Sequence, residues 1–202
     1  IRRARIIKKA KNKESIISKI IDELYPTDGN WIIYCEDEEQ LNSVLTNIQN
    51  KFKHIVFLKY HSKMSEQEKS SVKNYFEHNP SIIVSIRCLD EGVDIPKSNG
   101  AIILASSKNP RQYIQRRGRV LRRFKGKRYS DIVDVIVEPN ETEEDIEHSI
   151  IKSEISRAWK FAQNAQNRDI LHDLWRLCLI HKIDISLDAE LSFNIDDDDG
   201  EQ

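Results

Sequence analysis

The stretch Trp31-Ile32-Ile33-Tyr34 is a short apolar run of aromatic and β-branched residues. Such a run is typical of a strand that is buried on both faces of a parallel sheet. A turn-forming segment, 26–30, precedes it and separates it from the helix before. After it, apolar residues recur at the helical spacing i, i+3, i+4 and i+7: Leu41, Val44, Leu45 and Ile48. The sequence therefore predicts a buried strand followed by an amphipathic helix.

The same alternation of strand and helix continues along the chain. Further strands are predicted at 55–58, 81–86, 101–105 and 132–137. Helices are predicted to end near Tyr25, to start after Ser65 and to start at Asn109-Pro110. Ser65 is expected as an N-cap because Glu68 follows at the spacing of a capping box. The pattern predicts an α/β fold, in which helices on both faces cover a mainly parallel sheet and ligands bind beyond the carboxyl ends of its strands.

The character of the chain changes after Pro139. Four regions are expected: a linking helix over 1–25, a sheet domain over 26–138, a helical extension over 139–190 and an acidic, disordered tail over 191–202. The extension carries apolar residues at helical spacing on two segments. We assign its tryptophans, Trp159 and Trp175, to the core of this extension and not to a binding platform.

The composition excludes several classes of protein. Of the 202 residues, 39% are hydrophobic and 32% are charged, and the net charge is −1. No apolar run approaches the roughly 20 residues that span a bilayer, so no membrane partner is expected. Cys35, Cys88 and Cys178 are far apart and odd in number, which favours reduced thiols and a cytoplasmic location over disulfides or a metal site. Because the chain starts at Ile1 without a methionine, we expect it to be part of a longer one.

The segment 115–123, Gln-Arg-Arg-Gly-Arg-Val-Leu-Arg-Arg, carries five arginines, and the basic run extends to Arg128. In a helix, Gln115, Arg119 and Arg122 lie on one side. A guanidinium fork matches two oxygens of a phosphate group, so this side can bind a polyanion or a nucleotide. The alternative interpretation is a solvated basic face.

A phosphate-binding loop is absent from the sequence. The six glycines are too far apart for G-x-G-x-x-G or G-x-x-x-x-G-K-[ST]. This chain therefore cannot hold a nucleoside triphosphate in the usual way and supplies at most half of such a site.

A second candidate segment, 89–96, follows the strand 81–86 directly. Gly92 would allow close approach of the backbone to a ligand, and Asp94 could accept a hydrogen bond from a sugar hydroxyl. The alternative is a turn in which the carboxylate caps a helix.

These two segments resemble the last conserved motifs of superfamily 2 helicases and translocases. The pattern Q-x-x-G-R-x-x-R matches the motif whose glutamine and arginines reach an ATP molecule held by the first motor lobe. The resemblance implies catalytic roles for Gln115, Arg119 and Arg122. Glu91-Gly92-Val93-Asp94 is similar to the motif beside the ATP ribose, which implies ATP-binding roles for Gly92 and Asp94.

The resemblance covers about 31–137 and also implies contacts to a nucleic-acid strand. Ser106, Ser107 and Lys108 fall where the family touches the strand. The family usually places Thr or Ser at the position of Ile86, so Ser85 or Arg87 is the substitute expected there. The segment 60–65, Tyr-His-Ser-Lys-Met-Ser, resembles the loop before the family's next helix.

The implied function is the second, RecA-like motor lobe of an ATP-dependent helicase or translocase. ATP and Mg²⁺ would be held mainly by the absent N-terminal lobe, so this chain alone is expected to be inactive. The expected partners are a DNA or RNA strand, that N-terminal lobe, and a protein bound through the helical extension. Two alternatives remain open: a non-catalytic nucleic-acid-binding module with a degenerate helicase fold, and a scaffold lobe that binds only proteins.

Overall fold

A computed structural model describes residues 11–86, 98–104, 120, 124, 127–138 and 144–184, except for the side chains of 11–14, 144–147 and 161. Contacts within the chain divide it into two compact units, Ile1–Val135 and Ile136–Gln202. Each unit has its own hydrophobic core. The division falls three residues before the boundary that the sequence predicts after residue 138.

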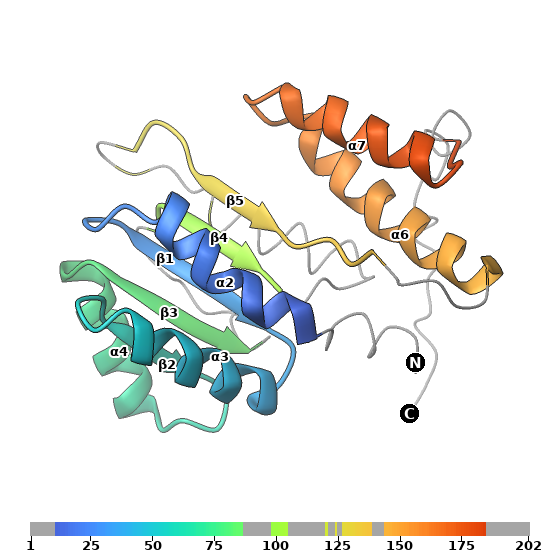
Figure 1. The fold of residues 1–202 in the computed structure, drawn as a ribbon. Helices are drawn as coiled ribbons and strands as arrows, with labels where there is room; N and C mark the ends of the chain where they lie inside the picture. Colours follow the sequence, from blue (N-terminus) through green and yellow to red (C-terminus); the bar gives the residue numbers. More distant parts are fainter. Residues whose placement is uncertain are drawn as a thin grey trace, which may run out of the picture. The chain divides into compact units, whose positions relative to one another are not determined.

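The first unit is an α/β unit (Figure 1). Its described elements, in chain order, are α2 (Lys11–Leu24), β1 (Asn30–Cys35), α3 (Glu38–Lys51), β2 (Phe57–Tyr60), α4 (Glu66–His78), β3 (Ser81–Ile86), β4 (Gly100–Ile103) and β5 (Asp131–Asp134). The strands form one sheet in the order β2-β3-β1-β4-β5, and each neighbouring pair is parallel. This confirms the predicted α/β fold with a mainly parallel sheet.

Strand β1 lies at the centre of the sheet and is buried along its whole length. Its residues Trp31, Ile33 and Cys35 face a core to which α2 and α3 also contribute. The helix α4 lies against β2 and β3, and its Phe76 is fully buried. A strand covered on both faces reads as a continuous apolar run, which is why the sequence located β1 so directly.

Only β3 keeps its predicted bounds; β1 is one residue longer at each end, and β4 runs from Gly100 to Ile103 instead of 101–105. The other two strands are shifted for reasons that the structure shows. The second strand begins at Phe57 instead of residue 55, because the Ile55 amide donates to the Phe52 carbonyl that follows α3. The last strand ends at Asp134 instead of residue 137. Its neighbour β4 has already ended at Ile103, so the residues after Val135 have no strand to pair with.

Gly100 makes room for the largest side chain of the core. It pairs with Trp31 across the sheet, and a Cβ atom on Gly100 would lie 2.4 Å from Cε2 of the indole. The indole is fully buried and meets the Tyr25 ring edge-on, with ring centroids 6.0 Å apart. The Tyr25 hydroxyl donates to the Gly29 carbonyl, and burial raises the pKa of this phenol to about 12.

We therefore expect Gly100→Ala to lower the free energy of unfolding by about 1–3 kcal/mol, because overpacking a dense core forces side chains out of their rotamers. Denaturant unfolding measures this loss. In a Trp31→Leu background the indole that would clash with the new Cβ atom is absent. Adding Gly100→Ala to that background should therefore lower the free energy of unfolding much less. Equal costs in the two backgrounds would contradict the proposed packing conflict.

The capping box predicted at Ser65 is present. The Ser65 hydroxyl accepts from the Glu68 amide, and the Glu68 carboxylate accepts from the Ser65 amide at 2.8 Å. The Ser65 hydroxyl also donates to this carboxylate at 2.8 Å. The bonds from the Ser65 amide and then from its hydroxyl hold the pKa of the Glu68 carboxyl below its usual range. A carboxyl with a depressed pKa stabilises the folded state above its unfolded-state pKa, and this contribution is lost as the pH falls through its folded-state pKa.

Ser65→Ala should accordingly cost about 1 kcal/mol of stability at neutral pH. The difference between Ser65→Ala and the native chain should shrink as acid protonates Glu68. Ser71→Ala is the control, because the Ser71 hydroxyl donates to the Gln67 carbonyl inside the same helix and caps no helix end. Thermal unfolding between neutral and acid pH measures both variants. Ser65→Ala keeps the amide bond to Glu68, so a difference that does not change with pH would argue against the bond from the Ser65 hydroxyl to this carboxylate.

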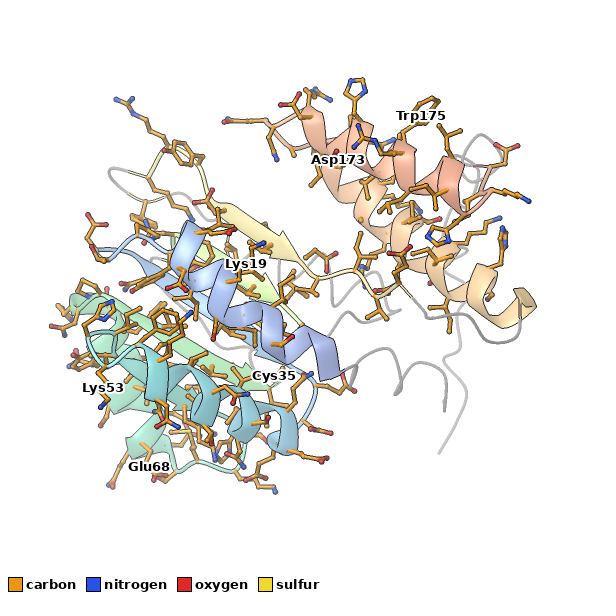
Figure 2. All side chains as sticks on the ribbon, in the orientation of Figure 1. Lys19, Cys35, Lys53, Glu68, Asp173 and Trp175 are labelled. Carbon is orange, nitrogen blue, oxygen red and sulfur yellow. The ribbon has the colours of Figure 1, made fainter. Side chains whose placement is uncertain are left out.

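The second unit contains the helices α6 (Glu144–Ala162) and α7 (Asp169–Ile180), which pack on each other. The buried Glu154 carboxylate pairs with Arg157 at 2.9 Å and accepts from the Val137 amide at 3.4 Å, so it ties the preceding segment to α6. Assigning both tryptophans to the core was half wrong. Trp159 packs against the core, but Trp175 is 55% exposed and projects from α7 (Figure 2).

Among the residues that the structure describes, no helix has the length and apolar composition needed to cross a bilayer. Cys35 and Cys178 are buried, and neither forms a disulfide bond in the part of the chain that the structure describes.

Candidate functional site

The carboxyl ends of the first four strands lie at one edge of the sheet. In the register of the parallel pairs, Cys35 of β1 lies beside Ile86 of β3, and Tyr34 of β1 lies beside Ile103 of β4. Tyr60 of β2 lies beside Ser85. The four strands therefore end within about one residue of each other. Loops that leave this edge are in the position where ligands bind to parallel sheets.

The nine predicted site residues lie outside the described part of the chain. They are Gln115, Arg119, Arg122, Gly92, Asp94, Arg87, Ser106, Ser107 and Lys108. The structure does place the strands that lead to them. The strand β3 ends one residue before Arg87. Leu104, which directly follows β4, lies two residues before Ser106. β3 and β4 flank β1. The two segments that carry the predicted nucleic-acid contacts therefore start on either side of the central β-strand.

The turn after β1 is fixed by a small hydrogen-bond network at this edge. The Asp37 carboxylate caps α3 by accepting from the Gln40 amide at 3.0 Å. The Gln40 side chain is buried and accepts from the Glu36 amide at 2.8 Å. Figure 2 marks this end of β1 at Cys35. The network holds the strand-to-helix turn in one conformation. Because the turn carries the carboxylates of Glu36 and Asp37, which repel anions, it is not itself a site for a polyanion.

The loop after β2 is tied to the start of α3. The Lys63 ammonium bonds the Glu38 carboxylate at 2.8 Å, and Lys59 lies 4.0 Å from the same carboxylate. The hydrogen bond from Lys63 holds the pKa of Glu38 below its usual range. Within the loop the Met64 amide donates to the His61 carbonyl at 3.2 Å. A nucleic-acid strand at this loop would have to compete with Glu38 for the two lysines.

The strand β3 answers one question that the sequence left open. Ser85 is fully buried and its hydroxyl donates to the Ile86 carbonyl at 2.8 Å. A buried and hydrogen-bonded hydroxyl argues against a contact from Ser85 to a nucleic-acid strand. Arg87 stays the predicted substitute.

Sequence reasoning missed the contacts made by Lys127. The sequence shows it as one more cation of the basic run that ends at Arg128, but its ammonium donates to the Ser98 carbonyl at 2.6 Å and to the Val120 carbonyl. The Ser130 hydroxyl also donates to the Val120 carbonyl, at 2.9 Å. The partners of Lys127 lie 29 and 7 residues away, so no local pattern could have indicated them. Burial lowers the pKa of this lysine.

Comparison with known proteins decides the family. A family model described as the helicase conserved C-terminal domain matches residues 12–124, more than half of the chain. The chain belongs to this helicase family. Apart from the first residue of α2, the match covers the seven described helices and strands from α2 to β4, and it includes the arginine segment. The resemblance of its motifs to the C-terminal lobe of superfamily 2 helicases is thereby confirmed.

This helicase C-terminal domain has a relative in Methanocaldococcus jannaschii, the protein MJ1505, named as a candidate ATP-dependent RNA helicase. The two are 34% identical over 100 residues, which are 48% of this chain and 13% of MJ1505. The chain therefore spans about one eighth of that relative.

Solved structures of DEAD-box proteins share the fold. The C-terminal domain of Dbp5 has a TM-score of 0.58 and 18% identity, covering 77% of this chain and 81% of that one. Domain 2 of the Mss116p helicase, solved bound to an RNA duplex, has a TM-score of 0.50 and 20% identity, covering 89% and 76%. At these identities the likeness concerns the fold alone.

Proposed function

We propose that this helicase C-terminal domain is the second motor lobe of an ATP-dependent nucleic-acid helicase or translocase. The observation that carries the proposal is the spacing of Gln115, Arg119 and Arg122 in a chain of this family. In this proposal the three side chains meet the γ-phosphate of an ATP molecule that the first lobe holds. Fixed guanidinium groups stabilise the charge that develops during phosphoryl transfer.

The residue types fit a nucleotide. Two arginines supply planar forks for phosphate oxygens, and Asp94 supplies an acceptor for a ribose hydroxyl. Gly92 carries no side chain that would block close approach of its backbone. Hydrolysis of ATP would drive the movement along the nucleic acid. ATP and Mg²⁺ would be held mainly by the N-terminal lobe, because this chain has no phosphate loop. The role proposed for this lobe is to complete the site.

A nucleic-acid strand would bind at the carboxyl edge of the sheet. Arg87 follows β3, and Ser106, Ser107 and Lys108 follow β4, the two strands that flank β1. Cations and hydroxyls of this kind bind backbone phosphates without reading bases. The names of MJ1505 and of the Mss116p complex refer to RNA, which makes RNA the first strand to test.

The isolated chain should therefore bind single-stranded RNA weakly and lose affinity steeply as salt rises. For single strands the slope of log K against log salt is about −0.7 per phosphate neutralised. Replacing both Arg87 and Lys108 by alanine should make the slope shallower by about 1.4. Fluorescence titrations at several salt concentrations measure it.

Lys53→Ala is the control for this experiment, because Lys53 is exposed beyond the end of α3, far along the chain from the proposed strand site (Figure 2). It should leave the slope nearly unchanged. Affinity that ignores salt, or that depends strongly on base sequence, would contradict binding through phosphates. Strand binding by a full-length protein that hydrolyses no ATP would support instead a non-catalytic binding module with a degenerate helicase fold.

A further inference from the structure

Within the arginine segment, 115–123, the structure describes the backbone at Val120, and there the backbone is anchored. Its side chain is buried, with 1% of its surface exposed. Its carbonyl accepts two hydrogen bonds, from the Lys127 ammonium and from the Ser130 hydroxyl. A buried carbonyl with two donors, one of them charged, is held strongly in place, because charge-assisted hydrogen bonds are about twice as strong as neutral ones.

The donors of Val120 are themselves fixed to the sheet. Lys127 also donates to the Ser98 carbonyl at 2.6 Å, just before β4. Ser130 directly precedes β5, whose first amide, that of Asp131, donates to the Asn99 carbonyl at 3.1 Å. The Asn99 amide in turn donates to the Asn30 carbonyl at 2.6 Å, at the start of β1. Val120 is thus connected to the amino ends of three neighbouring strands.

Val120 is the chain neighbour of Arg119 and stands two residues before Arg122. Consecutive Cα atoms are 3.8 Å apart, so fixing Val120 restricts where the backbone of both arginines can lie. Placement matters greatly for a group that acts on a transition state, since a misplacement of about 1 Å can reduce the rate about 10²-fold.

We propose that Lys127 is a positioning residue for the arginine segment, and that it acts through the Val120 carbonyl with Ser130 as its second donor. This inference rests on the proposed function. Lys127 does not touch ATP or the strand in this account. It stabilises the one arrangement of the backbone from which Arg119 and Arg122 reach the γ-phosphate, so its loss lowers the rate of the chemical step and not the affinity for ATP.

The test uses the full-length protein and the variant Lys127→Met, which keeps the length of the side chain and removes its donors. We expect kcat for RNA-stimulated ATP hydrolysis to fall about 10-fold or more, with KM for ATP and strand affinity changed less than about 2-fold. Ser130→Ala should show a smaller loss of the same kind. Lys127→Arg restores a charged donor and should recover part of kcat.

Arg128→Met is the matched control, because it removes the same charge at the next position, where the side chain is exposed. Arg128→Met should keep kcat within about 2-fold of the native value. If positive charge in the basic run mattered only in general, Arg128→Met and Lys127→Met would lower kcat by similar factors. Assays are made well below the melting temperature of each variant, so that the folded fraction is close to one and lost stability cannot account for lost turnover.

A double-mutant cycle separates positioning from structure. In an Arg119→Ala background, Lys127→Met should lower kcat by a smaller factor than in the native protein, because one of the two arginines that it positions is gone. If Arg119→Ala lowers turnover but Lys127→Met leaves kcat unchanged, or costs the same factor in both backgrounds, the positioning role is wrong and the proposed function stands. If Arg119→Ala itself leaves turnover intact, the proposed function fails.

Discussion

Arg119→Ala in the full-length protein should reduce ATP hydrolysis about 10³-fold or more and leave strand affinity nearly intact. An arginine finger acts mainly on the transition state, where charge spreads over the oxygens of the transferred phosphoryl group. Its partner is ATP and not the polynucleotide, so the two activities should separate. Steady-state turnover and strand affinity are measured on the same preparation.

Two further variants sharpen this result. Arg119→Lys should be nearly as inactive as alanine, because a point-charge ammonium cannot reproduce the two parallel hydrogen bonds of a guanidinium fork. Arg128→Ala should retain most of the turnover, since Arg128 is exposed and lies outside the spacing of the motif. Loss of strand affinity in proportion to turnover in Arg119→Ala would assign the arginines to a nucleic-acid patch instead.

The second large effect concerns the chain by itself. The purified 202-residue chain should hydrolyse no ATP above the uncatalysed background, with or without RNA. Its six glycines form no phosphate loop, and no Lys-Ser or Lys-Thr pair follows a glycine at the spacing that organises Mg²⁺. Arginines that complete a site cannot act on a nucleotide that nothing holds.

Contaminating ATPases are the main source of error in this measurement. The Arg119→Ala chain, purified in parallel, controls for them, because a contaminant hydrolyses ATP equally in both preparations. Steady turnover that is present in the native chain and absent from Arg119→Ala would show that the chain holds ATP unaided, and would contradict the half-site interpretation.

The sequence predicted the fold of the first unit well, because its central strand is covered on both faces. Trp31 to Tyr34 read as an uninterrupted apolar run, and the capping box at Ser65 needs only residues three apart. The start of β2 was two residues wrong. Ile55 is as good a strand former as Phe57, but its amide bonds the Phe52 carbonyl after α3 and not a neighbouring strand.

Two errors at the level of side chains have a common cause. Trp175 has the helical spacing of a core residue, yet α7 buries Leu174 and Cys178 on its packed side and leaves the indole exposed. Lys127 looks like one more cation of a basic run, yet it bonds main-chain carbonyls that lie far from it in sequence. Spacing reports which residues share a face, but what that face meets is decided by tertiary structure.

The residues of the candidate site were predicted from their types and from the resemblance of two motifs to those of superfamily 2 helicases. The described strands place the start of the segments that carry Arg87 and Ser106 on either side of β1, and Val120 fixes one point beside Arg119. The roles of the nine predicted site residues stay predictions, because they depend on contacts with ATP, with a strand and with a second lobe.

The most direct test of the central claim is a structure of the full-length protein bound to single-stranded RNA and to ADP with aluminium fluoride, a mimic of the transferred phosphoryl group. Our account predicts guanidinium nitrogens of Arg119 and Arg122 within about 3 Å of the fluoride atoms, at hydrogen-bond distance. Guanidinium groups of both arginines bonded to RNA phosphates, with no contact from this lobe to the mimic, would contradict it.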